Sequence, residues 1–201
     1  VSQTETLMNV SPGAAIGIAW AIFLLYWLIS SFTAKKIVKG ERGAGIARRV
    51  LIGVAAYVLL IHADDPRLGV LAERFLPYAR WVVWLGVALT FAGVFFAIWA
   101  RVHIGKYWSA TVALKAEHQL IRTGPYARIR HPIYTGILLA LCGSAIAVGR
   151  YAAILAVVVY AVAFWFKARK EEALLAGEFG PAFEEHRRNT GFFLPKLFAA
   201  H

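Results

Sequence analysis

Side chains that could do chemistry gather in one short stretch of the chain, residues 118–136. Pro132 opens a long apolar run within it, and proline is favoured at the first position of a helix, where its missing N–H costs nothing. His131 is therefore expected at the helix N-cap. Free backbone N–H groups and the positive end of the helix dipole could bind an anionic group there, such as a carboxylate. Three more polar side chains stand close to His131 in the sequence: Tyr126, Arg130 and Tyr134.

The same stretch also fits an interfacial loop with no chemical task. In that interpretation Arg128 and Arg130 meet lipid phosphate groups, and the tyrosines belong to the aromatic belt at a membrane surface. Composition alone leaves both interpretations open, so the elements around the stretch must be considered.

The composition is that of a membrane protein. Of 201 residues, 60% are hydrophobic and only 16% are charged, and about 20 apolar residues suffice for a membrane-spanning helix. The second of five apolar runs is short unless Arg48 and Arg49 snorkel. No segment shows strand-like alternation, so we expect an all-α fold, an integral membrane bundle of about five transmembrane helices. The five runs cover residues 6–34, 50–63, 81–100, 132–149 and 151–166.

Small residues recur at a spacing of four in two of these runs, a pattern that favours close packing between membrane helices. The first run contains Gly13, Gly17 and Ala21, and the fourth contains Gly136, Ala140 and Ser144. We therefore expect both helices to have close helix neighbours.

The charge distribution predicts an orientation. The net charge is +11, which fits either nucleic acid or anionic lipid as a partner, but 18 of the 22 lysines and arginines lie in segments 35–49, 101–131 and 167–201. Five spans place these three segments on one face, and the positive-inside rule makes that face cytoplasmic. The charge pattern therefore favours membrane lipids over nucleic acid as partners. It also predicts a multi-pass inner-membrane protein with its N-terminus outside.

The polar segment after the fifth run is expected to form an amphipathic helix that breaks near Gly180 and Pro181. The apolar residues 192–195 that follow could lie against the membrane. We expect His186, between these two features, to be solvated.

Two ordered motifs change the balance between the alternatives. Residues 118–136 read H-x-L-x3-G-P-Y-x3-R-H-P-x-Y-x-G, and the element Arg169-Lys170-Glu171-Glu172 follows the fifth run, with Phe179-Gly180 and Arg187-Arg188 beyond it. Together they resemble the signature of the isoprenylcysteine carboxyl methyltransferase family and its phospholipid methyltransferase relatives. The resemblance covers about residues 81–198, although Phe183 and His186 stand where the family often has tyrosines.

The resemblance implies a single domain over residues 1–201, with N-terminal spans in 1–80 and a catalytic core in 81–201. It also implies S-adenosylmethionine as the methyl donor, bound at the cytoplasmic face of a bacterial inner membrane. Arg130 or Arg169 is expected to pair with a substrate carboxylate, and Glu171 is the third residue expected to be catalytic. The residues implied in cofactor binding are His118, Leu120, Ile121, Gly124, Tyr126, His131, Pro132, Tyr134, Glu171 and Glu172.

The expected reaction is carboxyl O-methylation of a lipophilic, isoprenylcysteine-like substrate at the membrane interface. N-methylation of a phospholipid amine is the main alternative, and it needs a proton acceptor such as a glutamate or His131. A sterol-type membrane reductase and a non-enzymatic, lipid-binding protein are weaker alternatives. His, Cys, Asp and Glu show no metal-ligand spacing in the sequence, so we expect no metal centre.

Overall fold

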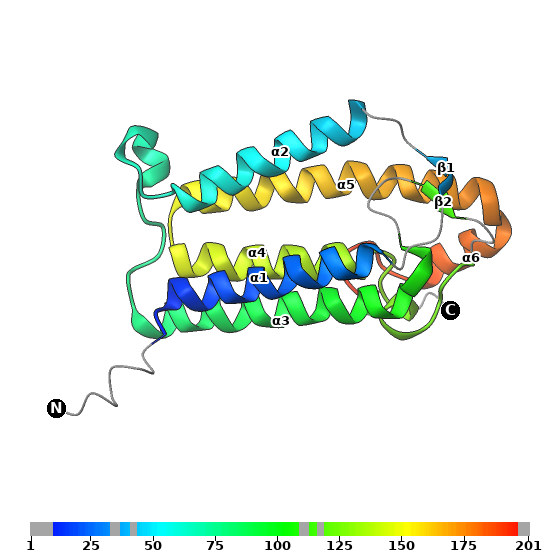
Figure 1. The fold of residues 1–201 in the computed structure, drawn as a ribbon, viewed down its shortest axis with the longest axis horizontal. Helices are drawn as coiled ribbons and strands as arrows, with labels where there is room; N and C mark the ends of the chain where they lie inside the picture. Colours follow the sequence, from blue (N-terminus) through cyan, green and yellow to red (C-terminus); the bar gives the residue numbers. More distant parts are fainter. Residues whose placement is uncertain (1–9, 33–36, 41–43, 109–112, 116–118, 197–201) are drawn as a thin grey trace.

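The computed structural model describes residues 10–32, 37–40, 44–108, 113–115 and 119–196, and Figure 1 shows them as a bundle of long helices. The helices are α1 (Pro12–Ser31), α2 (Ala44–Ile61), α3 (Arg80–Ile104), α4 (Pro132–Val148), α5 (Tyr151–Phe179) and the short α6 (Pro181–Asn189). Within the described ranges, three segments are long and apolar enough to cross a membrane: Pro12–Ser30, Arg80–Tyr107 and Tyr151–Phe179. Val50–Ile61 and Pro132–Val148 are shorter apolar helices. The expected helical membrane bundle is thus confirmed.

The links between the long helices contain small elements. The described parts of these links contain the short 3-10 helices η2 (Pro66–Ala72), η3 (Gly105–Tyr107) and η4 (Gly124–Ala127). Strands β1 (Ile37–Gly40) and β2 (Ala113–Lys115) pair in antiparallel fashion. Strands of three and four residues are too short to show alternation in the sequence, and this one pair leaves the expected all-α class unchanged.

The chain runs back and forth so that its functional segments meet at one end. In Figure 1, η3, η4, the strand pair and α6 lie at the same end of the bundle, while the link between α2 and α3 lies at the other. α1 and α4 pack against α3, and α2 packs against α5. The described parts of the basic segments 101–131 and 167–196 therefore share one end, as the charge pattern predicted.

Glycines bring α3 and α4 into close contact along most of their length. A Cβ added at Gly93 would lie 2.3 Å from the backbone nitrogen of Ala140, and one added at Gly136 would lie 2.6 Å from that of Ala97. The small-residue pattern of the fourth run therefore forms a helix interface, as expected. The pattern of the first run does not, because an added Cβ at Gly13 or Gly17 meets nothing within 4 Å.

A polar cluster ties α1 to this helix pair. The Trp20 indole N–H donates to Ser144 Oγ at 3.1 Å, and the Thr90 hydroxyl, fully buried, lies 3.3 Å from the same oxygen. Each hydroxyl also donates to a carbonyl one turn earlier in its own helix, Gly86 for Thr90 and Ala140 for Ser144. These bonds satisfy polar groups that would be costly to leave unpaired inside an apolar bundle.

The boundaries of α4 and α5 set up the site. α4 begins at Pro132 with His131 at the N-cap, as predicted, but the His131 side chain does not bond to the helix end. Gly149 ends α4 in the left-handed region with φ 68°, where glycine has no Cβ penalty. α5 continues well beyond the apolar run to Phe179, so its last turns project past the basic end of the bundle and carry Glu171 and Glu172.

Candidate active site

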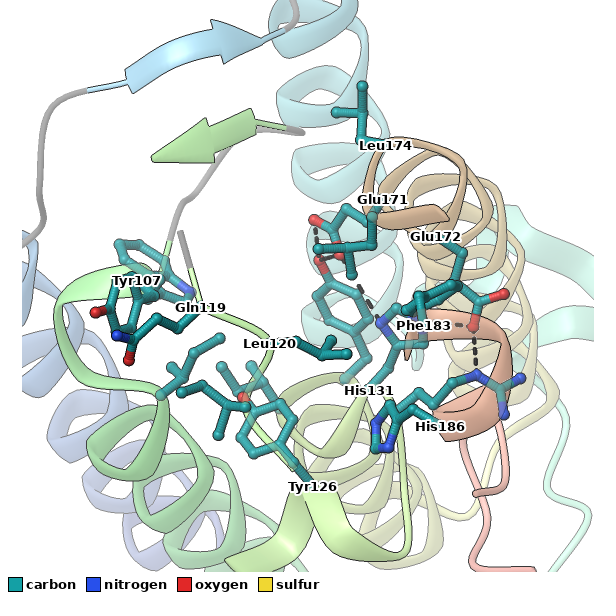
Figure 2. A pocket seen from close by; sticks show the side chains of 17 residues that line it. Tyr107, Gln119, Leu120, Tyr126, His131, Glu171, Glu172, Leu174, Phe183 and His186 are labelled. Carbon is teal, nitrogen blue, oxygen red and sulfur yellow. Dashed lines mark hydrogen bonds and ion pairs between the residues drawn. The ribbon is translucent and has the colours of Figure 1, made fainter. Parts of the chain in front are cut away.

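A pocket opens at the basic end of the bundle, between the links from α3 to α4 and the final turns of α5 (Figure 2). Its enclosed part measures about 130 Å³. Its lining mixes carboxylates, imidazoles and aromatic rings. The residues that line it are Ile104, Tyr107, Trp108, Gln119, Leu120, Ile121, Tyr126, Arg130, His131, Ile133, Tyr134, Glu171, Glu172, Leu174, Leu175, Phe183 and His186.

His131 lies at the centre of this arrangement, only 7% exposed. Its Nε2 is 3.3 Å from Glu172 Oε1, and its Nδ1 is 3.8 Å from Glu171 Oε2. The ring stacks on Tyr134, with centroids 5.6 Å apart, and the Phe192 ring meets it edge-on at 4.9 Å. The N-cap position thus turns the imidazole toward two carboxylates of α5, and away from its own helix end.

Arg130 forms a nearly buried ion pair beside His131. Its Nε donates to Glu172 Oε1 at 2.5 Å, and the two side chains are 12% and 8% exposed. The same guanidinium also donates to the carbonyls of Thr190 and Arg187 in the tail. Arg130 is therefore already engaged with Glu172 and the tail, and it orients Glu172 in the pocket wall.

Glu171 has a different set of partners. The Tyr134 hydroxyl donates to both of its carboxylate oxygens, at 2.8 and 2.9 Å. Lys167 Nζ lies 3.9 Å from Glu171 Oε1 and 5.1 Å from the centroid of the Tyr134 ring. Glu171 is thus held mainly by a neutral hydroxyl and only at longer range by a cation.

The chain after α6 crosses the site as a strap, residues 190–193. The backbone N–H groups of Arg130 and His131 donate to the carbonyls of Gly191 and Phe192, at 2.9 and 3.2 Å. The Thr135 hydroxyl donates to the Phe193 carbonyl at 2.6 Å. The expectation that the apolar residues here lie against the membrane was wrong for Phe192 and Phe193, because both rings pack around His131.

The structure brings most of the sequence-predicted residues together. Gly124 and Pro132 stand behind the pocket wall: Gly124 has φ 57° and faces the His103 ring, and Pro132 is fully buried. His118 lies outside the described residues. The predicted residues that line the pocket are Leu120, Ile121, Tyr126, Arg130, His131, Tyr134, Glu171 and Glu172.

Arg169 is not brought to the pocket, and its side chain is exposed. On a helix with 3.6 residues per turn, residues two apart point in directions about 200° different. Because Glu171 faces the pocket, Arg169 faces away from it. The structure therefore does not bring Arg169 together with the other predicted site residues, and its expected role toward a substrate carboxylate stays a prediction.

Sequence reasoning missed several wall residues. His186 was expected to be solvated, but it is 7% exposed and lines the pocket from α6. Burial, together with the nearby Arg122 and Arg130 charges, lowers the pKa of His186. Phe183, one turn earlier, is 3% exposed and lines the same wall. Their spacing of three on a short helix was the signal for a shared buried face.

Arg101 was also missed, and it supports the wall from behind. This residue of α3 is 1% exposed, and its terminal nitrogens donate to the carbonyls of Gly105 and Ser30, at 2.8 and 2.7 Å. Its guanidinium lies 4.5 Å from the centroid of Trp108, which lines the pocket. Arg101 therefore joins the end of α1 to the pocket wall through a cation–π contact.

The chemistry of the lining suits a ligand that carries positive charge. Two carboxylates, Glu171 and Glu172, line the pocket beside aromatic side chains such as Tyr126 and Trp108, and carboxylates and aromatic rings both attract cations. Among the residues that the structure describes, no group of three or more His, Cys, Asp and Glu side chains could hold a metal ion.

The comparisons with known proteins agree with this geometry. The model of the isoprenylcysteine carboxyl methyltransferase (ICMT) family matches residues 84–177, which span α3, α4 and most of α5. The chain is therefore similar to that family over this segment. It contains the residue 118–136 motif and the paired glutamates, so the family resemblance of the sequence is confirmed.

Among the proteins similar to the chain are two curated relatives and one solved structure. The cobalt-zinc-cadmium resistance protein CzcN of Cupriavidus metallidurans is 33% identical over 132 residues, 64% of this chain and 59% of that protein. The protein-S-isoprenylcysteine O-methyltransferase of Schizosaccharomyces pombe is 31% identical over 104 residues, 49% of this chain and 43% of that protein. The chain thus spans about three-fifths or less of the length of these relatives.

The solved structure is that of the eukaryotic intramembrane Ras methyltransferase ICMT. It aligns with a TM-score of 0.60 at 20% identity, over 94% of this chain and 69% of that chain. The likeness shows a shared fold. Together with the long apolar helices, it supports an integral membrane protein.

Proposed function

We propose that this chain transfers a methyl group from S-adenosylmethionine to the carboxylate of a lipophilic, isoprenylcysteine-like substrate at the membrane surface. The observation that carries the proposal is the cluster of Glu171, Glu172, His131 and Tyr134 in one pocket at the basic end of an ICMT-family bundle. The name of the Schizosaccharomyces pombe relative supports the same reaction.

The residues present fit S-adenosylmethionine. Bound S-adenosylmethionine supplies an electrophilic methyl group on a positively charged sulfur. Glu171 and Glu172 match its cationic groups, and Leu120, Ile121 and Tyr126 offer apolar and aromatic surface. The enclosed 130 Å³ is smaller than the roughly 300–1,000 Å³ of most small-molecule sites, so the ligand extends toward the open side of the pocket.

In this proposal the protein's own residues bind the two reactants and orient them. A carboxylate acceptor is already ionised near neutral pH, so no side chain has to remove a proton. Tyr134 fixes Glu171, Arg130 fixes Glu172, and His131 stands between the two carboxylates. The strap and its phenylalanines shield the site from water, which strengthens every charge interaction inside it.

We propose that the site faces the cytoplasm from a bacterial inner membrane, and the basic segments at the same end of the bundle support this orientation. A lipophilic acceptor then reaches it from the bilayer, while the polar methyl donor arrives from the cytoplasm. N-methylation of a phospholipid amine is left as an outcome of the test.

The test uses the purified protein in phospholipid vesicles with methyl-labelled S-adenosylmethionine and N-acetyl-S-farnesylcysteine. The proposal predicts labelled, alkali-labile methyl ester on the farnesylcysteine. Label found only in the amine headgroup of phosphatidylethanolamine, or no label transfer at all, would contradict it.

A further inference from the structure

A second hollow lies on the outer side of the bundle, between α2 and α5, and it measures about 530 Å³. Ile52 of α2 and Val159, Val162 and Phe166 of α5 give it apolar walls. It ends at two lysines, Lys167 and Lys170. Its volume falls within the roughly 300–1,000 Å³ range of small-molecule sites, so it can hold a flexible apolar chain.

Lys167 separates this hollow from the pocket. It lines the hollow, and its Nζ also contacts two residues of the pocket wall, the Tyr134 ring at 5.1 Å and Glu171 Oε1 at 3.9 Å. The Lys167 side chain is only 12% exposed. The nearly buried Lys167 side chain therefore lies between the apolar hollow and the Glu171 carboxylate of the pocket.

We propose that Lys167 binds the acceptor carboxylate and that the hollow between α2 and α5 holds the acceptor's apolar chain. The proposal rests on the proposed function and extends it, because it assigns the acceptor's carboxylate to Lys167 and its apolar chain to the hollow. Charge complementarity selects the occupant: an apolar chain that ends in one carboxylate matches apolar walls that end in ammonium groups.

The other cations near the pocket fit this role less well. Arg130 is engaged with Glu172 at 2.5 Å and with tail carbonyls, and Arg169 is exposed on the far side of α5. The pair between Lys167 and Glu171 is longer, at 3.9 Å, and Glu171 keeps its Tyr134 hydroxyl if the lysine shifts. Among these cations, Lys167 is the one that lines the hollow and also contacts the pocket wall.

Binding of both reactants keeps the net charge of the site unchanged. The cationic methyl donor lies beside Glu171 and the anionic acceptor lies beside Lys167, so each of these two residues, 3.9 Å apart in the structure, faces a ligand of opposite charge. In the transfer, an acceptor oxygen forms the new bond to the methyl carbon, the bond from that carbon to sulfur breaks, and its electron pair stays on sulfur. No proton, oxidant or reductant is required, and both reactants lose their charge together.

The first experiment measures binding of N-acetyl-S-farnesylcysteine to the protein in phospholipid nanodiscs, beside its methyl ester, independently of turnover. The wild type is expected to bind the free acid more tightly than the ester, and Lys167→Gln should lose this preference with a roughly tenfold or greater fall in affinity. Lys167→Arg should retain much of it. Arg128→Gln removes one exposed charge at the same end of the bundle and serves as the matched control.

The second experiment tests the hollow with N-acetyl-S-prenylcysteines of five, ten and fifteen chain carbons. Ala163→Trp fills the hollow and should weaken binding of the longest chain most, whereas Leu155→Trp, on the lipid-exposed surface of α5 and outside the hollow, should not. Val159→Phe gives a smaller obstruction if Ala163→Trp fails to fold.

The outcomes separate the two proposals. Acid-selective binding that requires Lys167, without methyl transfer, would uphold this inference and contradict the proposed function. Methyl transfer with unchanged acceptor binding in Lys167→Gln would overturn the inference alone. Equal loss of acceptor and S-adenosylmethionine affinity in Lys167→Gln would also overturn it, because the lysine would then support the donor pocket. If Ala163→Trp leaves the dependence of binding affinity on prenyl chain length unchanged, the hollow is not the binding site of the apolar chain.

Discussion

At the scale of single residues, the sequence motifs identified the pocket but not how its members pair. The order of residues in 118–136 brought Tyr126, Arg130, His131 and Tyr134 into view, and all four line the pocket. Their partners on α5 depend on which face of the helix each glutamate occupies. The packing of α5 against its neighbours decides which of its faces meets the pocket, so the motif alone could not show that Arg169 points away from the pocket.

Arg130 and Arg169 should therefore respond differently to truncation. Arg130→Ala leaves Glu172 nearly buried without its ion pair, at an expected cost of about 3–5 kcal/mol in the free energy of unfolding. Arg169→Ala removes an exposed side chain, and the expected change is within about 0.5 kcal/mol. Thermal unfolding of both variants in detergent measures the difference. Equal destabilisation by the two would contradict the pairing described for Glu172.

His186 gives the site a predictable dependence on pH. Burial, Arg122 and Arg130 lower its pKa, partly offset by Glu172, and His131 also faces it. The unfolded chain, with an ordinary pKa of about 6.5, binds the proton before the folded chain does. The contribution of His186 to stability is therefore complete above that pH and is lost as the pH falls below it.

The prediction is that the free energy of unfolding falls between about pH 7 and pH 5, and that His186→Gln makes this fall shallower. Chemical unfolding across that range, for wild type and variant in parallel, checks it. A variant curve as steep as the wild-type curve would show that other groups cause the dependence.

At the scale of elements, close contact between α3 and α4 fixes where the pocket residues start. An Ala at Gly136 would place its Cβ 2.6 Å from the Ala97 backbone nitrogen, so the two helices would have to separate. α4 carries His131 and Tyr134 at its first turn, and α3 leads into Trp108. The spacing of small residues predicted this interface in α4 but gave a false signal in α1, where Gly17 faces open space.

Gly136→Ala is expected to destabilise the protein by about 1–3 kcal/mol, as overpacking does in a tight interface. Gly17→Ala is the matched control, because the same change meets nothing within 4 Å and should be neutral or slightly stabilising. Unfolding in detergent compares the two. A Gly17→Ala cost as large as that of Gly136→Ala would contradict the packing.

At the scale of the whole molecule, hydropathy and charge predicted the bundle and the shared basic end. They could not predict the strap, because residues 190–193 are held by backbone bonds to residues some sixty positions earlier. Nor could they reveal that α5 extends beyond the apolar run as one helix, since that depends on its contacts with α6 and the pocket.

The orientation makes a prediction of its own. Single cysteines at Glu73, in the link between α2 and α3, and at Glu178, near the end of α5, should react with an impermeant thiol reagent from opposite sides of the membrane. Cys142→Ser provides the background. Glu178→Cys should be protected in intact cells. Labelling of both positions from the same side would contradict the proposed arrangement of spans.

The central claim is that the pocket around Glu171 binds the methyl donor. Calorimetric titration of S-adenosylmethionine into the purified protein tests it most directly, with Glu171→Gln and Arg169→Gln as a matched pair on opposite faces of α5. The account predicts that wild type and Arg169→Gln bind with similar affinity and that Glu171→Gln binds at least roughly tenfold more weakly, as loss of a charged partner implies. Unchanged binding by Glu171→Gln together with lost binding by Arg169→Gln would contradict the account.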